Sequence, residues 1–179
     1  MTETKGTALL VIDVQKDVVE LAHDRDGVVA AINTVVTLAR EAEVPVIWVQ
    51  HDDQDLPADT DGWQIVDELT PAANDPIVRK NYRDAFESTD LADHLSRLAV
   101  DRLVVTGAQS DYCVRWTLHG ALGRGFDTVL VSDGHTTDID GGPGLPSGES
   151  VIAHTNQIWA TQDHPKATAS VVGSTDVEF

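Results

Sequence analysis

Three residues of complementary chemistry each follow a short β-branched run of the chain. Asp13 comes directly after the first such run, Lys80 follows another, and Cys113 follows a third and opens a stretch with helical spacing. A carboxylate can take the proton of a thiol and later return it to a leaving amine, while a lysine beside it holds the carboxylate and balances its charge. The set therefore predicts a cysteine nucleophile, its general base and a supporting cation.

Cys113 is the only cysteine of the chain. It cannot form an intramolecular disulfide or join a zinc site built from several cysteines, so it serves either packing or chemistry. At a helix start, unpaired amide groups and the helix dipole stabilise a thiolate, and a nearby lysine lowers the thiol pKa further. We therefore expect a lowered pKa. Taken singly, all three residues have ordinary structural explanations, but their joint position at three strand ends favours catalysis.

The elements that position these residues alternate between apolar runs and stretches of helical spacing, a pattern typical of βαβ units. We predict an α/β fold over residues 1–179 as a single domain, with three αβα layers and a doubly wound, mainly parallel, Rossmann-like sheet of six strands. The runs lack polar alternation, which indicates strands covered on both faces. Such sheets bind ligands beyond the carboxyl ends of their strands. The predicted strands are 8–12, 44–49, 77–78, 103–105, 128–131 and 169–172.

Four helices are predicted between these strands. The first spans 28–42 and the second 90–98, with Thr89 or Asp90 as its cap. The third begins near Cys113 and ends at Gly123 or Gly125, and the fourth spans 147–159 after Pro146.

The charge of the chain excludes several classes of partner. It carries 30 acidic and 12 basic residues, a formal net charge of −18. This charge repels phosphate backbones and anionic lipid surfaces, so we expect neither nucleic acid nor membrane as a partner. No apolar tract is long enough to cross a bilayer, and the start of the chain lacks the features of a signal peptide. We expect a soluble, cytoplasmic protein with a solvated acidic surface.

Several segments also carry a family resemblance over nearly the whole chain: 8–15, the Lys80 segment up to Phe86, 88–91, 104–107 and 112–114. In these segments the chain resembles the isochorismatase-like cysteine hydrolases, which include nicotinamidases, N-carbamoylsarcosine amidohydrolases and ureidoacrylate amidohydrolases. The resemblance implies Asp13 as base, Lys80 as its partner and Cys113 as nucleophile. It also implies a cis peptide bond between Ala108 and Gln109, which aims the backbone amides of Gln109 and Cys113 at the developing oxyanion.

The implied reaction is attack of Cys113 on an amide, carbamoyl or lactam carbonyl of a small molecule, with loss of the amine and hydrolysis of a thioester by water. The chain would then be a hydrolase of carbon–nitrogen bonds other than peptide bonds, and it would need no cofactor. Family members that cleave the vinyl ether of isochorismate typically lack this cysteine, which argues against that reaction. Since family members are often dimers or larger, we expect a homo-oligomer. For the glycine- and proline-rich loop 138–146 a lid, an interface element and a plain connector stay open as alternatives.

Nicotinamidases of this family carry a metal beside the cysteine, held by an Asp-x-His arrangement and a further histidine. Here His51, Asp52 and Asp53 follow the second predicted strand in a different order, without an obvious downstream histidine, so we predict no metal site. A mainly apolar pocket with few polar groups would suit a small organic amide. The candidates for its wall, with core packing as the alternative, are Gln15, Trp63, Tyr112, Trp116 and His135.

Alternatives to this function remain open at the level of sequence. The aspartates of residues 51–61, with Asp138 and Asp140, predict a negative potential at the pocket mouth and so a cationic substrate. This favours a streptothricin-type hydrolase, which opens a lactam in a positively charged antibiotic. A catalytically idle binding or scaffold member of the same fold is a second alternative. A receiver-type signalling module is rejected, because it needs an acidic pair after the first strand and its lysine only after the fifth.

Overall fold

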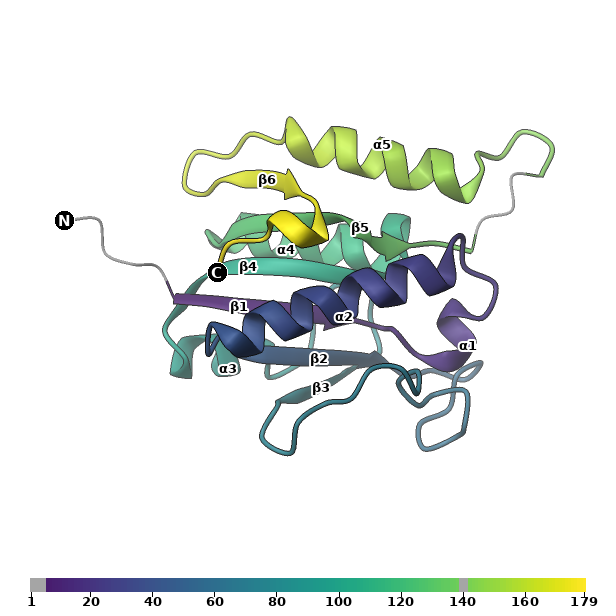
Figure 1. Cartoon of the computed structure of the whole chain (residues 1–179), viewed down its shortest axis with the longest axis horizontal. Helices are drawn as coiled ribbons and strands as arrows, with labels where there is room; N and C mark the ends of the chain where they lie inside the picture. Colours follow the sequence, from purple (N-terminus) through teal and green to yellow (C-terminus); the bar gives the residue numbers. More distant parts are fainter. Residues whose placement is uncertain (1–5, 139–141) are drawn as a thin grey trace.

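The computed structural model describes residues 6–138 and 142–179, which form a six-stranded sheet with helices on both faces (Figure 1). All neighbouring strands are parallel, and the strand order is β3-β2-β1-β4-β5-β6. The predicted doubly wound α/β fold is confirmed. The strands are β1 (Gly6–Ile12), β2 (Val46–His51), β3 (Ile77–Lys80), β4 (Val100–Ala108), β5 (Asp127–Thr136) and β6 (Ala169–Val172).

The order of the strands reverses between β1 and β4, which lie side by side at the centre of the sheet. In open α/β sheets the loops on either side of such a reversal diverge to opposite faces and leave a crevice at the carboxyl edge. Asp13 follows β1 and Cys113 follows β4. The fold therefore brings two of the predicted functional residues to this crevice.

The four predicted helices are confirmed as α2 (Arg25–Glu41), α3 (Leu91–Arg97), α4 (Arg115–Arg124) and α5 (Gly148–Ala160). Ser147 caps α5, since its hydroxyl accepts a hydrogen bond of 3.2 Å from the amide of Ser150. At α3 the hydroxyl of Thr89 accepts from the amide of Leu91 at 3.3 Å, whereas Asp90 makes no capping bond with its side chain.

Three short elements were not predicted, because each is too short to show a hydrophobic period. They are α1 (Lys16–Val19), the π-helical turn η1 (Ser110–Val114) and the 3₁₀ turn η2 (Ser174–Asp176).

Two apolar layers hold the helices to the sheet. On the face turned toward the viewer in Figure 1, α2 packs Ile32 and Val35 against β1 side chains such as Leu9. On the opposite face α3, α4 and α5 bury side chains such as Leu95 and Leu118. Fully burying one such side chain stabilises the fold by roughly 1.5–3 kcal/mol. The prediction of strands covered on both faces is therefore confirmed.

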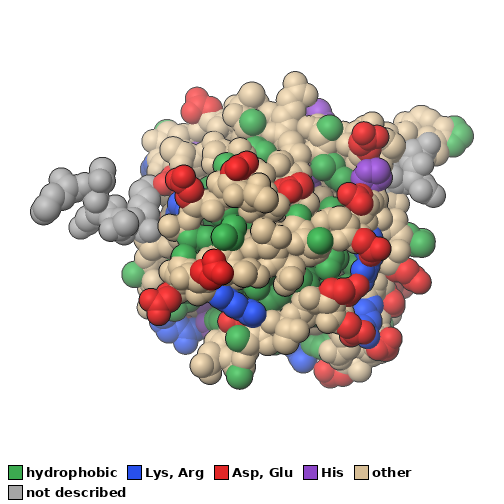
Figure 2. Space-filling model, in the orientation of Figure 1, with side chains coloured by type: hydrophobic (Ala, Val, Ile, Leu, Met, Phe, Trp, Pro, Cys, Tyr) green, Lys and Arg blue, Asp and Glu red, His purple; other side chains and the backbone are tan. Residues whose placement is uncertain are grey.

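The surface carries the acidic excess of the sequence. Figure 2 shows Asp and Glu side chains spread over the face of α2 and more numerous there than Lys and Arg. In the part of the chain that the structure describes, no helix is both long and apolar enough to span a bilayer.

Candidate active site

Asp13 and Lys80 form a buried ion pair at the carboxyl edge of the sheet. Asp13 is the first residue after β1, and its backbone amide donates to the carbonyl of Val49 in β2 at 2.9 Å. Lys80 is the last residue of β3, and its Nζ lies 2.6 Å from Oδ2 of Asp13, with both side chains at most 1% exposed. Neither oxygen of Asp13 makes a hydrogen bond with residues 6–138 and 142–179, and Oδ1 also lacks the ion-pair contact that Oδ2 has with Lys80. Oδ1 is therefore available to take a proton.

The segment that carries Cys113 begins where β4 passes close to the end of β1. Gly107 has a φ of 123°, and a Cβ at this position would overlap the carbonyl oxygen of Ile12, its register partner in β1. Glycine fits because it has no Cβ and tolerates positive φ. The next peptide bond, between Ala108 and Gln109, is cis, as the family resemblance implies. The chain then turns through η1, which places Cys113 at the crevice.

Lys80 connects the carboxylate to the thiol. Its Nζ donates to Sγ of Cys113 at 3.3 Å and lies 3.2 Å from Nδ1 of His51. A lysine ammonium has three N–H donors, and here they meet the carboxylate of Asp13, the sulfur and the imidazole. The structure thus brings together the three residues that the sequence singled out and adds His51 to them.

The protonation of this cluster differs from the prediction. Burial raises the pKa of the Cys113 thiol to about 12, the carboxylate of Asp13 adds to this rise, and Lys80 opposes it. Burial by itself lowers the pKa of Lys80, but Asp13 and Cys113 outweigh it, so the net pKa of Lys80 is raised. The expectation of a lowered thiol pKa is wrong, because desolvation and a neighbouring carboxylate outweigh the lysine. At neutral pH the thiol keeps its proton and Lys80 is charged.

His51 has both ring nitrogens engaged. Since the Lys80 ammonium can only donate, Nδ1 accepts and Nε2 donates to Oδ2 of Asp53 at 3.0 Å. This hydrogen bond and the backbone amides of Leu56 and Asp55 lower the pKa of Asp53. In the described ranges 6–138 and 142–179, no three His, Cys, Asp or Glu side chains are grouped so as to hold a metal ion. The pair His51 and Asp53 does not match the donor set of the nicotinamidases.

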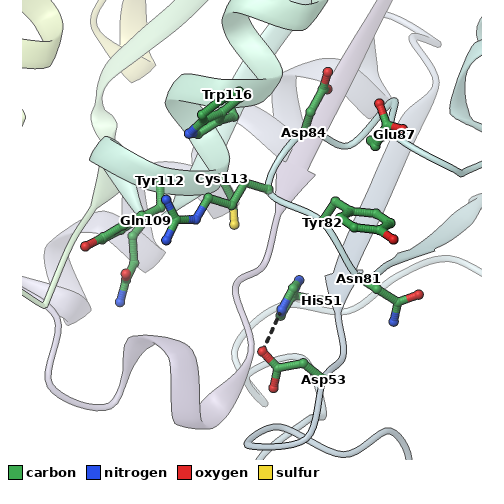
Figure 3. Close-up of a pocket in the computed structure, with 11 residues that line it drawn as sticks. His51, Asp53, Asn81, Tyr82, Asp84, Glu87, Gln109, Tyr112, Cys113 and Trp116 are labelled. Carbon is green, nitrogen blue, oxygen red and sulfur yellow. Dashed lines mark hydrogen bonds and ion pairs between the residues drawn. The ribbon is translucent and has the colours of Figure 1, made fainter.

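Two cavities meet at the sulfur. The larger has a volume of about 720 Å³, and Figure 3 shows the sulfur of Cys113 directed toward the space between Gln109, Tyr82 and His51. Tyr82 and Trp116 are 57% and 54% exposed and form part of its rim. The lining residues are His51, Asp53, Asn81, Tyr82, Arg83, Asp84, Glu87, Gln109, Tyr112, Cys113 and Trp116.

The smaller cavity has a volume of about 280 Å³ and lies on the Asp13 side of the sulfur. It shares His51, Asp53, Gln109 and Cys113 with the larger one. The other lining residues are Asp13, Asp17, Val18, Asp55 and Leu56.

Comparison with known proteins identifies the family of this chain. Residues 7–140 match the family model described as the isochorismatase domain. The chain belongs to the isochorismatase family.

Relatives within the isochorismatase family include enzymes of carbon–nitrogen bonds. The chain is 37% identical over 145 residues to a streptothricin hydrolase of Streptomyces noursei, covering 77% of this chain and 58% of that protein. It is 39% identical over 75 residues to an N-carbamoylsarcosine amidase of Arthrobacter sp, covering 42% of this chain and 28% of that protein. The chain thus spans little more than half of the first relative and less than a third of the second. A crystal structure of an isochorismatase family protein superposes with a TM-score of 0.84 at 30% identity, covering 94% of this chain and 99% of that chain.

The five side chains predicted for the pocket wall of this isochorismatase-family protein separate into two groups. Tyr112 and Trp116 line the larger cavity, and the guanidinium of Arg83 stacks 4.3 Å from the ring centroid of Tyr112. Gln15, Trp63 and His135 are buried and line neither cavity at Cys113. Their positions agree with the alternative of core packing.

Gln15 and Trp63 instead hold the strand ends together. The side-chain amide of Gln15 donates to the carbonyls of His51 and Trp63, both at 2.9 Å, and its oxygen accepts from the amide of His51 at 2.8 Å. Arg79 covers the ring of Trp63 at 4.7 Å. The two contacts with the backbone of His51 hold that residue in place, so Gln15 supports the site without lining either cavity.

His135 supports the turn that carries the cysteine. Its Nδ1 accepts a hydrogen bond of 2.7 Å from the hydroxyl of Ser110, the first residue of η1, because its Nε2 faces the amide oxygen of Asn156 at 3.0 Å and must donate there. Asn156 in turn donates to the carbonyl of Ser132 at 2.9 Å. Sequence reasoning missed Ser110 and Asn156, since both contacts join segments far apart in the chain.

The acidic loop of residues 51–61 divides between two roles. Asp53 and Asp55 line the cavities, whereas Asp59 pairs with Arg79 at 3.4 Å and Asp61 with Lys16 at 3.0 Å, away from the sulfur. Asp138 is exposed and lines neither of these two cavities. Residues 139–141 lie outside the described residues, and the prediction for Asp140 and for the whole of loop 138–146 falls partly on them.

Proposed function

We propose that this chain hydrolyses an amide-type carbon–nitrogen bond of a small molecule through a thioester at Cys113. The observation that supports this most directly is the contact of Lys80 with both Oδ2 of Asp13 at 2.6 Å and Sγ of Cys113 at 3.3 Å, at the point where two cavities meet. A base, a cation and a nucleophile in hydrogen-bond reach of one another are the arrangement that nucleophilic acyl transfer requires.

The raised pKa of the thiol assigns a definite task to Asp13. Because Cys113 is protonated at rest, its proton has to leave as the sulfur attacks the carbonyl carbon. Asp13 takes this proton, and the negative charge of the carbonyl oxygen is received by the backbone amides of Gln109 and Cys113. When the carbon–nitrogen bond breaks, Asp13 returns the proton to the nitrogen and the acyl group stays on the sulfur.

Hydrolysis of the thioester uses the same groups in reverse. A water molecule takes the place of the departed amine, Asp13 accepts one of its protons, and the oxygen attacks the acyl carbon. The carbon–sulfur bond then breaks, and the thiol regains its proton from Asp13. Lys80 stays charged throughout and keeps the carboxylate oriented toward the sulfur.

The test is a screen of small amides, carbamoyl compounds and lactams with wild type, Cys113→Ala and a matched surface control, Ser96→Ala on α3. We expect turnover by wild type and Ser96→Ala and none by Cys113→Ala, with the mass of an acyl group on Cys113 in a rapidly quenched sample. Turnover that survives Cys113→Ala contradicts the nucleophile. Tight binding of these compounds without turnover by wild type favours an idle binding member of the family instead.

A second candidate is a lactam hydrolase of the streptothricin type that acts on a cationic substrate. Its support is the 37% identity to a streptothricin hydrolase and the carboxylates of Asp53 and Asp55 at the cavities. Opening of a cationic lactam at a rate far above that of open-chain amides would favour it.

Assembly and location stay predictions from the sequence. We expect a homo-oligomer in the cytoplasm, and light scattering behind a sizing column tests the first of these.

A further inference from the structure

We propose that the two cavities at Cys113 divide the substrate, so that the acyl part occupies the larger cavity and a leaving amine that carries an additional positive charge occupies the smaller one. This inference rests on the proposed function and adds to it the substrate class. We call the larger cavity the acyl cavity and the smaller one the amine cavity.

The division follows from which residues border which cavity. Cys113 and Gln109 line both, so the sulfur lies at the junction. Asp13 lines only the amine cavity; it is 1% exposed, and its Oδ1 lacks a hydrogen-bond partner in the described part of the chain. A buried carboxylate oxygen at a cavity wall that has no hydrogen-bond partner in the protein can accept a hydrogen bond from a donor on the substrate.

The chemistry of the proposed reaction then orients the substrate. The nitrogen must lie within hydrogen-bond reach of Asp13 to receive the proton that Asp13 took from Sγ, a distance of roughly 2.6–3.2 Å between heavy atoms. The carbonyl carbon must lie at the sulfur. With the nitrogen on the Asp13 side, the substituents of the nitrogen extend into the amine cavity and the acyl substituent extends into the acyl cavity.

Charge decides what the amine cavity prefers. Four carboxylates line it, those of Asp13, Asp17, Asp53 and Asp55, and no lysine or arginine among residues 6–138 and 142–179 does. Asp13 is balanced by Lys80, and Asp53 accepts from His51. For Asp17 and Asp55 the described residues provide no ion pair. Because both are exposed, solvent screens them and each contributes a preference of only a few-fold for a cation.

The acyl cavity has a different character. Tyr82, Tyr112 and Trp116 present aromatic surface to it. Its charged side chains are those of Asp53, Asp84, Glu87 and Arg83, and Asp84 is paired with Arg124 at 3.4 Å. Aromatic side chains bind flat or apolar groups, and the guanidinium of Arg83 makes this cavity less negative than the amine cavity. At about 720 Å³ against about 280 Å³, the acyl cavity also tolerates more bulk than the amine cavity.

The experiment compares three phenylacetamides that differ in whether and where they carry a positive charge. N-(3-aminopropyl)phenylacetamide carries a cation on the amine side, N-butylphenylacetamide is its neutral counterpart, and N-butyl-4-(aminomethyl)phenylacetamide carries the cation on the acyl side. We expect kcat/KM to be about tenfold higher for the first than for the second, with the gain largely lost at 1 M salt. The third should show no gain over the second.

Variants assign the effect to the cavity. Asp17→Asn with Asp55→Asn should lower the ratio of the first two rates toward one, whereas Asp101→Asn, an exposed acid at the start of β4, should keep it. Leu56→Trp fills the amine cavity. It should lower kcat/KM for N-butylphenylacetamide more than for phenylacetamide, the primary amide with the same acyl group. An equal gain from a cation on either side, or a loss in Leu56→Trp that follows the size of the acyl group, overturns the inference.

The same ordering is measured without turnover, by calorimetric binding of the three amides to Cys113→Ala. Hydrolysis without a preference for the amine-side cation contradicts the division of the substrate and leaves the proposed function intact. Activity that persists in Cys113→Ala contradicts the proposed function, and the binding order then still decides where the cation lies.

Discussion

The hydroxyl of Ser110 donates a hydrogen bond of 2.7 Å to Nδ1 of His135, and both side chains are fully buried. Ser110 opens the turn that ends at Val114 and contains Cys113, so this bond fixes the turn to the end of β5. A second bond, 2.8 Å from the hydroxyl of Thr137 to the carboxylate of Asp111, holds the next residue of the turn. The position of the sulfur therefore depends on a strand that contributes no group to the reaction.

Replacement of His135 by alanine tests this support. The change leaves the Ser110 hydroxyl and the Oδ1 oxygen of Asn156 without their hydrogen bonds to His135, so we expect the free energy of unfolding to fall by about 2–4 kcal/mol. Activity should fall as well, chiefly in kcat. Urea denaturation measures the first effect, with the exposed His154→Ala on α5 as the control. A loss below about 0.5 kcal/mol, the range of ordinary surface substitutions, contradicts the role of His135.

The same histidine makes stability depend on pH. Burial lowers the pKa of His135 from its ordinary value of 6.5. Below pH 6.5 the unfolded chain binds a proton that the native chain does not, so stability should be full above this pH and decline as pH falls below it. Burial, with Arg115 second, lowers the pKa of His119 in the same direction. Urea midpoints between pH 5 and pH 7 should therefore rise with pH, and His135→Gln should flatten the rise. An unchanged slope in His135→Gln assigns the effect to other groups.

Asp13→Asn separates the reactivity of the thiol from catalysis. The carboxylate of Asp13 raises the pKa of Cys113, second only to burial, so its removal should lower that pKa and speed alkylation by iodoacetamide at pH 8. Hydrolysis should nevertheless fall at least a hundredfold, because the general base is gone. In wild type the alkylation rate should keep rising above pH 9, in keeping with a thiol pKa of about 12. Slower alkylation in Asp13→Asn would contradict the assigned electrostatics.

Lys80→Met tests the buried pair. It leaves the carboxylate of Asp13 buried without a counter-charge, and loss of one partner of a buried ion pair costs about 3–5 kcal/mol. The double variant Asp13→Asn with Lys80→Met should lose less than the sum of the two single changes. The neighbouring Arg79→Met is the matched control, since the Arg79 side chain is 53% exposed and its pair with Asp59 lies in solvent. Additive losses would mean that the pair is not coupled.

Much of the fold was predictable from the sequence because its signals are local. Short continuous runs of β-branched and aliphatic residues such as 8–12 are typical of strands buried on both faces, and the spacing of Ile32, Val35 and Val36 is typical of a helix with one buried side. The placement of Asp13, Lys80 and Cys113 together followed from the rule that parallel strands end at the same edge. The short turns were not predictable, because a π-helical turn such as η1 has no period to detect.

The residues behind the site were beyond sequence reasoning for a different reason. His135 and Gln15 are polar residues that look equally suited to a pocket wall or to a satisfied core position. Which of these applies depends on whether partners such as Asn156 or the carbonyl of His51 come within hydrogen-bond distance, and these partners lie 21 and 36 residues away in the chain.

By itself the sequence determined which functional groups the site contains and that they lie at one edge of the sheet. These groups are a carboxylate, an ammonium and a single thiol at the ends of three parallel strands. Only the tertiary structure decided the protonation state of that thiol and which side of it faces which cavity. A pKa depends on the surroundings of a group in three dimensions, and burial of Cys113 next to Asp13 outweighs the lysine and the helix start that the sequence pointed to.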